Sequence, residues 1–315
     1  MLQSSLPSSG VSPIQRPAMG SIHVGPESRL PTIPPRIGLI AGEGDFPLTL
    51  AKAARSEGVE IITFGINGLA NDRLREHSTA MYTLKLSEIS KLVEHARTHK
   101  LHHVIMAGRV PHNILLKQIS FDPRILRVLG SLANKRADSL LSAAVGELEK
   151  EGIKVLDSTM FLKSCMPEPG ILTKRLTPSE EILRDIDFGY PIAKEIGRLD
   201  IGQAIAVRNG IVLAVEALEG TDALIERVHG MVGEGWVLVK VSKPRQDMRF
   251  DVPVVGLTTI RNLAKHGAVA LCLTAHESLF FDRQDAIPFA EQCGINIIAR
   301  GDDDSVFNYV NATNS

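Results

Sequence analysis

Short apolar runs alternate with amphipathic stretches along the first half of the chain. Residues 37–41 form an apolar run typical of a buried parallel strand, and residues 59–66 form a second one. Between these runs, apolar residues recur at helical spacing over residues 48–55, and Gly58 ends the predicted helix. A strand, a glycine-rich turn, a helix and a second strand within about thirty residues indicate a βαβ unit.

The same alternation continues to residue 157. Alternating strands and helices favour a parallel, doubly wound sheet with helices on both faces. We therefore predict an α/β fold that begins with a Rossmann-like parallel sheet domain, and we expect Ser87 to cap its second helix. The further strands are predicted at residues 80–86, 102–108 and 153–157, and the further helices at residues 87–100, 122–130 and 137–150.

The pattern changes near Cys165. Residues 164–181 carry three prolines and a glycine, which is typical of a domain boundary. Beyond it, two apolar runs flank the pair Asn209-Gly210, a strong hairpin signal, so we predict a C-terminal mixed α/β domain. Further strands are predicted at residues 236–242 and 268–274, and further helices at residues 179–199 and 258–267.

These patterns divide the chain into four predicted parts. Residues 1–35, rich in Ser and Pro, are expected to be a disordered tail, because they contain too little apolar surface to order themselves. Residues 36–165 form the predicted N-terminal domain, and residues 166–300 form the C-terminal domain that carries the candidate catalytic motifs. Residues 301–315 are expected to be a polar tail that frays.

Composition narrows the class of protein. The chain has 315 residues and a net charge near −1, so no global field attracts nucleic acid. Three cysteines are too few and too scattered for a disulfide framework or a zinc site, and we expect a reducing, cytoplasmic location. No apolar run reaches the roughly 18 to 20 residues of a membrane span.

The turn after the first strand carries candidate chemistry. Gly42 and Gly44 stand where a strand passes into a helix, and amides at a helix start can bind anions. Pro47 replaces the third glycine of the dinucleotide fingerprint, and residues 67–68 offer no acidic group for a ribose. A nicotinamide site is therefore disfavoured, while a plain tight turn and a nucleotide or phosphate contact both remain open.

Several familiar catalytic motifs are missing from the sequence: it contains no Walker A loop, no H-E-x-x-H and no G-x-S-x-G. Arg109 follows a predicted strand at the end where open α/β sheets bind ligands. It is a candidate phosphate contact, with an ordinary surface arginine as the alternative.

Two short segments flank the predicted hairpin. Asp200 and Gln203 precede it and are candidates for a cleft. After it, residues 219–222 lie between a strand and a helix. Thr221 or Asp222 is expected to cap that helix, and Glu219 or Asp222 could instead face a cation.

Residues 240–253 mix charges of both signs and contain two prolines. A solvated loop can carry such a mixture. However, Asp251 stands between Phe250 and Val252, and a carboxylate with apolar neighbours is costly unless cations or a metal ion pair with it. Lysine and arginine beside aspartate also suit a diphosphate held with a divalent ion. The other charged residues are Lys240, Lys243, Arg245, Asp247 and Arg249.

Three stretches together resemble the UDP-2,3-diacylglucosamine pyrophosphatases of the LpxI type, from about residue 36 to residue 300. They read IGLIAGEGDFP, EIGRLDIGQAIAVRNGIVLAVEALEGTDA and KVSKPRQDMRFDVPVVGLTTI. The resemblance implies cleavage of a UDP-lipid diphosphate in lipid A synthesis, giving UMP and diacylglucosamine 1-phosphate. It also implies magnesium dependence, two domains around the lipid and a homodimer.

By position, Asp251 matches the essential aspartate of that family, and Asp222, Lys243 and the Gly42/Gly44 turn match other signature positions. We therefore expect Asp251 and Asp222 to be catalytic and to be the candidate Mg²⁺ ligands. A peripheral contact with the inner membrane is a further expectation. The predicted substrate-binding residues are Gly42, Gly44, Arg109, Asp200, Gln203, Thr221, Lys240, Lys243 and Arg249.

Two alternatives remain open at this point. One is a non-catalytic nucleotide- or lipid-binding regulator of envelope synthesis, which would keep the clefts without turnover. The other is a Rossmann-type oxidoreductase, which would bind a nicotinamide cofactor.

Overall fold

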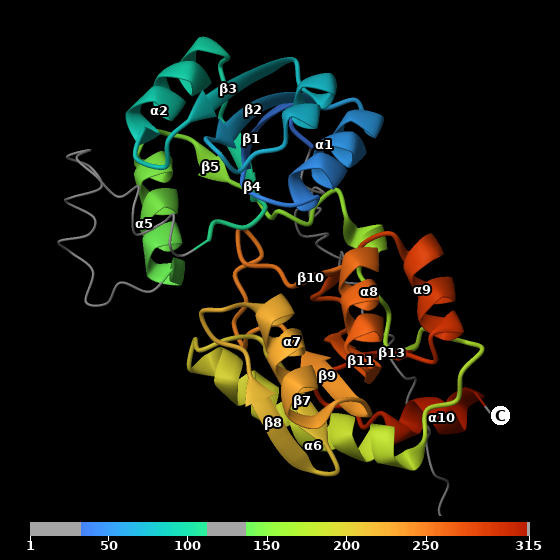
Figure 1. Ribbon diagram of the computed structural model, residues 1–315. Coiled ribbons are helices and arrows are strands. Elements are labelled where there is room, and N and C mark those ends of the chain that lie inside the picture. Colours follow the sequence, from blue (N-terminus) through green and yellow to red (C-terminus); the bar gives the residue numbers. More distant parts are fainter. Residues whose placement is uncertain (1–32, 112–136, 314–315) are drawn as a thin grey trace, which may run out of the picture. The chain divides into compact units, whose positions relative to one another are not determined.

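A computed structural model describes residues 33–111 and 137–313 (Figure 1). From Pro34 onward, the described residues belong to one compact unit. The predicted tail up to residue 32 and the helix predicted at residues 122–130 lie outside the described residues. None of the described helices is long and apolar enough to cross a membrane.

The N-terminal strands form a wholly parallel sheet in the order β3-β2-β1-β4-β5. The order reverses between β1 and β4, as in Rossmann-like folds. The predicted α/β class and the parallel sheet are thereby confirmed. The strands are β1 (Arg36–Ala41), β2 (Glu60–Ile66), β3 (Ala80–Leu84), β4 (His103–Ala107) and β5 (Lys154–Val155).

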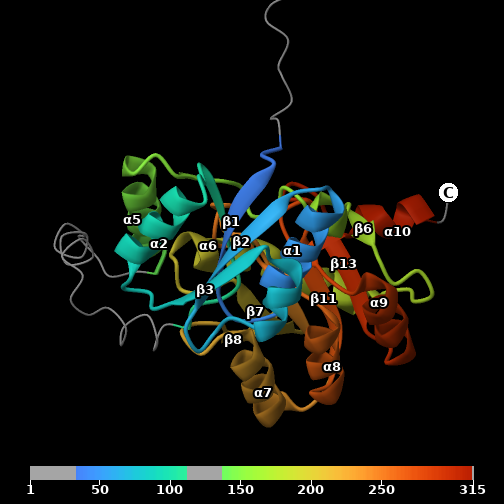
Figure 2. The same cartoon turned by 90° about the horizontal axis from the view of Figure 1, so that it is seen from above.

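Helices cover both faces of this sheet because its strands are apolar on both sides. Leu39 and Ile61 pack in one cluster with α1 (Phe46–Ser56). Phe64 and Val104 pack in another cluster with α2 (Ile89–Thr98) and α5 (Ala137–Lys150) (Figures 1 and 2). Short 3-10 helices η1 (Asp72–His77) and η2 (Lys163–Cys165) complete this part.

The cap predicted for α2 is wrong. The N-cap residue is Glu88 rather than Ser87, and its side chain makes no cap hydrogen bond. The Glu88 carboxylate instead accepts from the amide of Lys85 at 2.9 Å and pairs with Lys91. The first of these bonds closes a turn ahead of the helix.

The C-terminal strands form a mixed sheet in the order β6-β13-β11-β9-β7-β8, which confirms the mixed α/β prediction. β9, β11 and β13 run parallel, whereas β6 pairs antiparallel with β13 and β7 pairs antiparallel with both β8 and β9. The strands are β6 (Gly170–Ile171), β7 (Ala204–Arg208), β8 (Ile211–Val215), β9 (Trp236–Lys240), β11 (Ala268–Thr274) and β13 (Asn296–Arg300).

The predicted hairpin joins β7 and β8. Asn209 and Gly210 have φ angles of 54° and 70°, the left-handed conformation that a two-residue type I′ turn requires. The buried carboxylate of Asp185, from α6 (Glu180–Arg198), accepts from both turn amides at 2.9 and 2.7 Å. The hairpin is therefore fixed by its own turn residues and by the helix beneath it.

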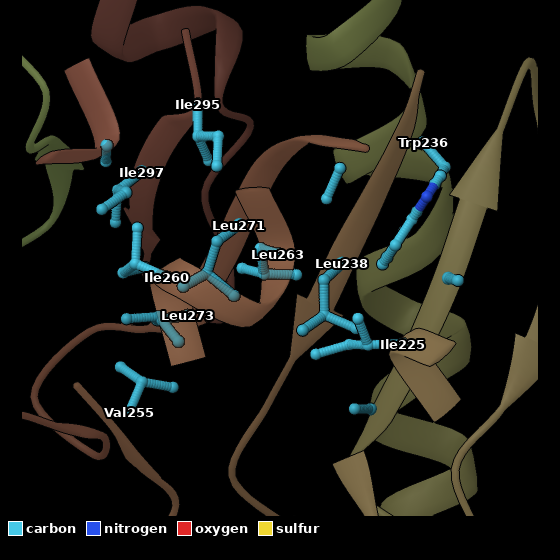
Figure 3. Packing of buried hydrophobic residues seen from close by; sticks show 14 of the residues in the cluster. Ile225, Trp236, Leu238, Val255, Ile260, Leu263, Leu271, Leu273, Ile295 and Ile297 are labelled. Atoms are coloured by element: carbon cyan, nitrogen blue, oxygen red, sulfur yellow. The ribbon is translucent and has the colours of Figure 1, made fainter. Parts of the chain in front are cut away.

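Successive strand residues face opposite helical layers. Leu238 and Leu271 pack with Ile225 and Leu263 from α7 (Thr221–Val232) and α8 (Leu257–Lys265), as Figure 3 shows. The next residues along these strands, Val239 and Cys272, pack against α6 instead. α9 (Arg283–Gln292) shares the first layer, and β10 (Val254–Val255) pairs in parallel with β12 (Leu279–Phe280).

The prediction of a fraying tail after Gly301 is wrong for the part that the structure describes. Val306 is fully buried against the α6 layer, and α10 (Phe307–Thr313) follows it. Asp302 accepts from the hydroxyl of Tyr190 at 2.7 Å and pairs with Lys194 at 2.8 Å. Apolar residues that follow the acids, together with partners for Asp302 and Asp304, hold this segment on the domain.

Candidate functional site

Asp251 lies at the centre of a polar cluster on the loop between β9 and β10. Its Oδ2 is 2.8 Å from the ammonium nitrogen of Lys243, and the same nitrogen is 2.7 Å from Oδ1 of Asp200. The side chains of Lys243, Asp200 and Asp251 are only 14%, 22% and 26% exposed. One ammonium group therefore joins two carboxylates in a partly desolvated site, where charge pairing is stronger than in water.

Gln203 holds the other side of the Asp251 carboxylate. Its Nε2 donates to both carboxylate oxygens, at 3.0 and 3.1 Å, and its backbone amide donates to Oε2 of Glu216 at 2.9 Å. Reversing the amide would turn an oxygen toward the carboxylate, so these contacts set its orientation. In the described part of the chain, Gln203 Oε1 is buried and has no hydrogen-bond partner.

Thr221 and Lys240 extend the network from Glu216. The hydroxyl of Thr221 donates to Oε1 of Glu216 at 2.7 Å, and the ammonium of Lys240 donates to that hydroxyl and to the carbonyl oxygen of Val254, both at 3.2 Å. The predicted cap is wrong, because the N-cap of α7 is Gly220 with no side-chain cap bond. The residues Asp200, Gln203, Glu216, Thr221, Lys240, Lys243 and Asp251 are called the Asp251 cluster below.

Sheet geometry explains why these residues meet. β7 runs antiparallel to both of its neighbours, so its first residue lies beside the last residues of β8 and β9. Ala204 is the register partner of Lys240, and the amide of Glu216 donates to the carbonyl oxygen of Ala204 at 2.8 Å. The backbone of Gly202 lies so close that an added Cβ would be 2.1 Å from the carbonyl oxygen of Glu216. Glycine is therefore required there.

Of the cluster, only Glu216 was not among the residues predicted from the sequence. It directly follows β8, where the hairpin register brings it opposite Ala204, and a register drawn for that hairpin would have placed it at the same edge. Glu216 was missed as a candidate because the other residues from 211 to 218 are apolar and read as one uninterrupted strand.

Asp222 lies apart from this network. It is exposed in the first turn of α7, and Asn262 of α8 donates to its Oδ1 at 2.8 Å. No contact among the described residues joins it to Asp251.

Glu219 pairs with Arg227 at 2.6 Å, and hydrogen bonds from its own amide and from Arg227 lower the pKa of Glu219 despite an opposing effect of burial.

The Arg249 guanidinium pairs with two acids outside the Asp251 cluster. Its guanidinium contacts Asp247 through two nitrogens, at 2.9 and 2.8 Å, and lies 3.3 Å from Glu149. This paired contact from Arg249 lowers the pKa of Asp247. The predicted part of Arg249 in substrate binding therefore requires that it exchange one of these partners.

The glycine turn has a structural role at Gly42. The amide of Gly42 donates to the carbonyl oxygen of Ala107 at 2.8 Å, and Glu43 and Arg109 form an antiparallel bridge next to it. A Cβ at Gly42 would lie 2.6 Å from the carbonyl oxygen of Arg109. Close approach of two backbones explains this glycine, and its amide already has an acceptor. Gly44, with φ of 97° and open space around it, keeps its predicted phosphate contact as a prediction.

The Arg109 side chain is 67% exposed and pairs with Glu43 at 3.2 Å. Its Nη1 also lies next to Gly220, 3.4 Å from where a Cβ of that residue would stand. The guanidinium thus reaches the start of α7, next to Thr221 in the sequence.

Comparison with known proteins identifies the family of this chain. The family model of the LpxI N-terminal domain matches residues 36–165, and the model of the LpxI C-terminal domain matches residues 168–298. The chain belongs to the LpxI family. A curated relative, the "UDP-2,3-diacylglucosamine pyrophosphatase LpxI" of Caulobacter vibrioides, is 34% identical over 274 residues, covering 84% of this chain and 96% of the relative.

Similarity to solved structures is much weaker than the match to the LpxI family. A GalE-like L-threonine dehydrogenase from Cupriavidus necator is 13% identical over 88% of both chains, with a TM-score of 0.32. A biotin carboxylase domain from Hydrogenobacter thermophilus is 12% identical over 62% of this chain and 40% of its own, with a TM-score of 0.21. Scores this low add nothing to the assignment to the LpxI family.

A cavity of about 380 Å³ lies at the N-terminal ends of α1, α8 and α9. Lys52 and Arg73 bring positive charge to its lining, and Phe46 and Phe281 bring apolar surface. No member of the Asp251 cluster lines it. The Asp251 cluster is therefore distinct from this cavity.

Whether the Asp251 cluster suits a magnesium ion depends on its donor set. In the residues that the structure describes, no three His, Cys, Asp or Glu side chains are arranged to hold a metal ion. Magnesium, however, is commonly bound by one or two carboxylates together with substrate phosphates. Asp251 provides one carboxylate of the kind that such a site uses, whereas Asp222 lies outside the Asp251 cluster.

Proposed function

We propose that this chain hydrolyses the diphosphate of UDP-2,3-diacylglucosamine to UMP and 2,3-diacylglucosamine 1-phosphate. Membership in the LpxI family, with a relative named for this substrate, supports the reaction class. The observation that carries the proposal is the Asp251 carboxylate, held by Lys243 on one side and Gln203 on the other. A fixed carboxylate next to cations is what attack of water on a diphosphate requires.

Asp251 would orient the attacking water and take its proton. The water oxygen forms a bond to one phosphorus, the bond from that phosphorus to the bridging oxygen breaks, and the bridging oxygen leaves with the other phosphate. Attack at either phosphorus gives the same two products. Gln203 and Lys243 fix the carboxylate before the reaction, so little reorganisation is needed at the transition state.

Lys240 would neutralise the charge that develops on the diphosphate. Its described contacts, Thr221 Oγ1 and the carbonyl oxygen of Val254, are neutral oxygens, so its positive charge is not balanced by a carboxylate there. Arg109, largely exposed and next to Gly220, would add a second cation from the N-terminal strands. Such preorganised cations stabilise the extra negative oxygen in the transition state.

Magnesium is part of the proposal, with Asp251 as its protein ligand. When bound, the ion would neutralise phosphate charge and polarise the phosphoryl group under attack. Asp222 as a second ligand, the homodimer and a peripheral contact with the inner membrane stay predictions.

The test is turnover by the purified full-length chain. UDP-2,3-diacylglucosamine is incubated with the protein in Mg²⁺ or in EDTA, and both products are measured by mass spectrometry. We expect UMP and the lipid phosphate in equal amounts with Mg²⁺, and a large loss of rate in EDTA. Binding without UMP release would contradict the proposal and favour the non-catalytic binder.

A further inference from the structure

Lys243 shares its ammonium between two carboxylates rather than serving Asp251 alone. The nitrogen lies 2.7 Å from Asp200 and 2.8 Å from Asp251, so both acids meet at one cation. An ammonium group has three N–H donors, and two of them point to these carboxylates. With two of its three donors engaged by these acids, Lys243 is poorly suited to be the main phosphate contact.

The backbone of Asp200 is arranged for this contact. It follows the last turn of α6 with φ of 57°, and its amide donates to the carbonyl oxygen of Gly197 at 3.0 Å. The left-handed conformation disfavours most side chains but suits glycine, asparagine and aspartate. Of these three, only aspartate carries a charge, and here its carboxylate pairs with the Lys243 ammonium.

The end of α6 also fixes Lys243 by direct packing. A Cβ at the buried Gly197 would be 3.5 Å from both Cα and Cγ of Lys243, so helix and loop are in contact at this point. The amide of Lys243 donates to Oε1 of Gln246 at 2.7 Å, which closes the turn that follows. Helix, turn and Asp200 together therefore determine where the ammonium lies.

We infer that Asp200 and Lys243 are positioning residues: they hold the Asp251 carboxylate in place, and the Lys243 ammonium occupies the cation position between the two acids until the substrate arrives. This inference rests on the proposed function for its catalytic consequence. Two facing carboxylates without a cation between them would attract a hard divalent ion. With the ammonium in place, a free divalent ion must displace a paired cation, so the substrate-free protein binds it weakly.

The first test measures metal binding in the absence of substrate and needs no turnover. Full-length protein is titrated with MnCl₂, and free Mn²⁺ is followed by electron paramagnetic resonance. Lys243→Met should bind Mn²⁺ at least about tenfold more tightly than wild type, because Asp200 and Asp251 are then free to bind it. The matched control is Lys240→Met, which removes the same charge nearby from neutral partners and should bind as wild type does.

The double variant Lys243→Met/Asp200→Asn should lose the gained affinity, since one of the two carboxylates is gone. Mn²⁺ affinity of Lys243→Met equal to that of wild type would overturn the inference. So would an equal gain in Lys240→Met, which would show a general charge effect. If Lys243→Met shows no gain in Mn²⁺ affinity but the wild-type protein turns over the lipid, the proposed function stands and the inference fails. If the gain is seen but the lipid is not turned over, the position of Lys243 between the two acids stands and the proposed function fails.

The second test uses Asp200→Asn, because asparagine adopts the same left-handed backbone and should fold normally. Loss of the positioning charge should lower kcat by about tenfold while KM for the lipid changes less than about threefold. The control Glu195→Gln removes an exposed charge one turn earlier on α6, where it pairs with Arg198, and should keep both constants. A wild-type kcat for Asp200→Asn would contradict the positioning role, even if Lys243→Met failed to fold.

Discussion

The backbone amides of Glu43 and Arg109 each donate to the other residue's carbonyl oxygen, at 2.8 and 3.0 Å. This bridge ties the ends of β1 and β4 together at the point where the strand order of the N-terminal sheet reverses. In open α/β sheets, that point is where nucleotides bind. Here a backbone bridge lies at that point, and Pro47 stands in place of the third glycine of the dinucleotide fingerprint.

We predict that Gly42→Ala destabilises the protein by about 2 kcal/mol, because the new Cβ would press on the Arg109 backbone. Urea unfolding measures the effect. Gly146→Ala is the control: this helical glycine of α5 has open space around it, so alanine should be neutral or stabilising by up to about 1 kcal/mol. Equal stability of Gly42→Ala and wild type would show that the close approach is not needed.

The Asp247–Arg249 pair predicts a pH-dependent effect. Arg249 lowers the pKa of Asp247 in the folded protein, so the pair stabilises the fold above the ordinary carboxyl pKa and loses this effect as pH falls through the lowered value. Asp247→Asn should therefore reduce Tm at pH 7. The gap to wild type should shrink below about pH 4.

Thermal unfolding of both proteins at pH 7, 5, 4 and 3 checks this. Glu195→Gln changes an exposed residue that pairs with Arg198 across one helical turn, and it should show little difference from wild type at any of these pH values. A gap between Asp247→Asn and wild type that widens as pH falls would have the wrong sign for the pair.

The segment after Gly301 gives a further prediction. Val306 is fully buried, so Val306→Ala should destabilise the protein by about 2 kcal/mol through lost burial and a small cavity. Asp303→Ala, at an exposed position three residues earlier, should stay within about 0.5 kcal/mol of wild type. Urea unfolding would refute the packing of this segment if the two variants were equally stable.

Periodicity predicted much of the fold, since long apolar runs and the Asn209-Gly210 turn are local signals. Two-residue strands such as β10 and β12 were not predictable, because their pairing is set by tertiary contacts alone. The packed C-terminal segment was missed because its acidic composition hides the burial of Val306.

The candidate site was predictable to a similar extent. Charge pattern and spacing pointed to residues that the sheet does bring together, among them Asp200, Gln203 and Asp251. What the pattern could not give was pairing. It could not show that Arg249 pairs with Asp247, or that Gly220 rather than Thr221 is the N-cap of α7. These choices depend on three-dimensional neighbours.

The measurement that tests the account most directly is kcat/KM of Asp251→Asn with UDP-2,3-diacylglucosamine and Mg²⁺. Asparagine keeps the size of the side chain but cannot take a proton from water, so we predict a loss of at least about 100-fold. Circular dichroism should show an intact fold, and calorimetric titration should show that the lipid still binds. Retention of more than about a tenth of the wild-type kcat/KM would contradict a catalytic role for Asp251.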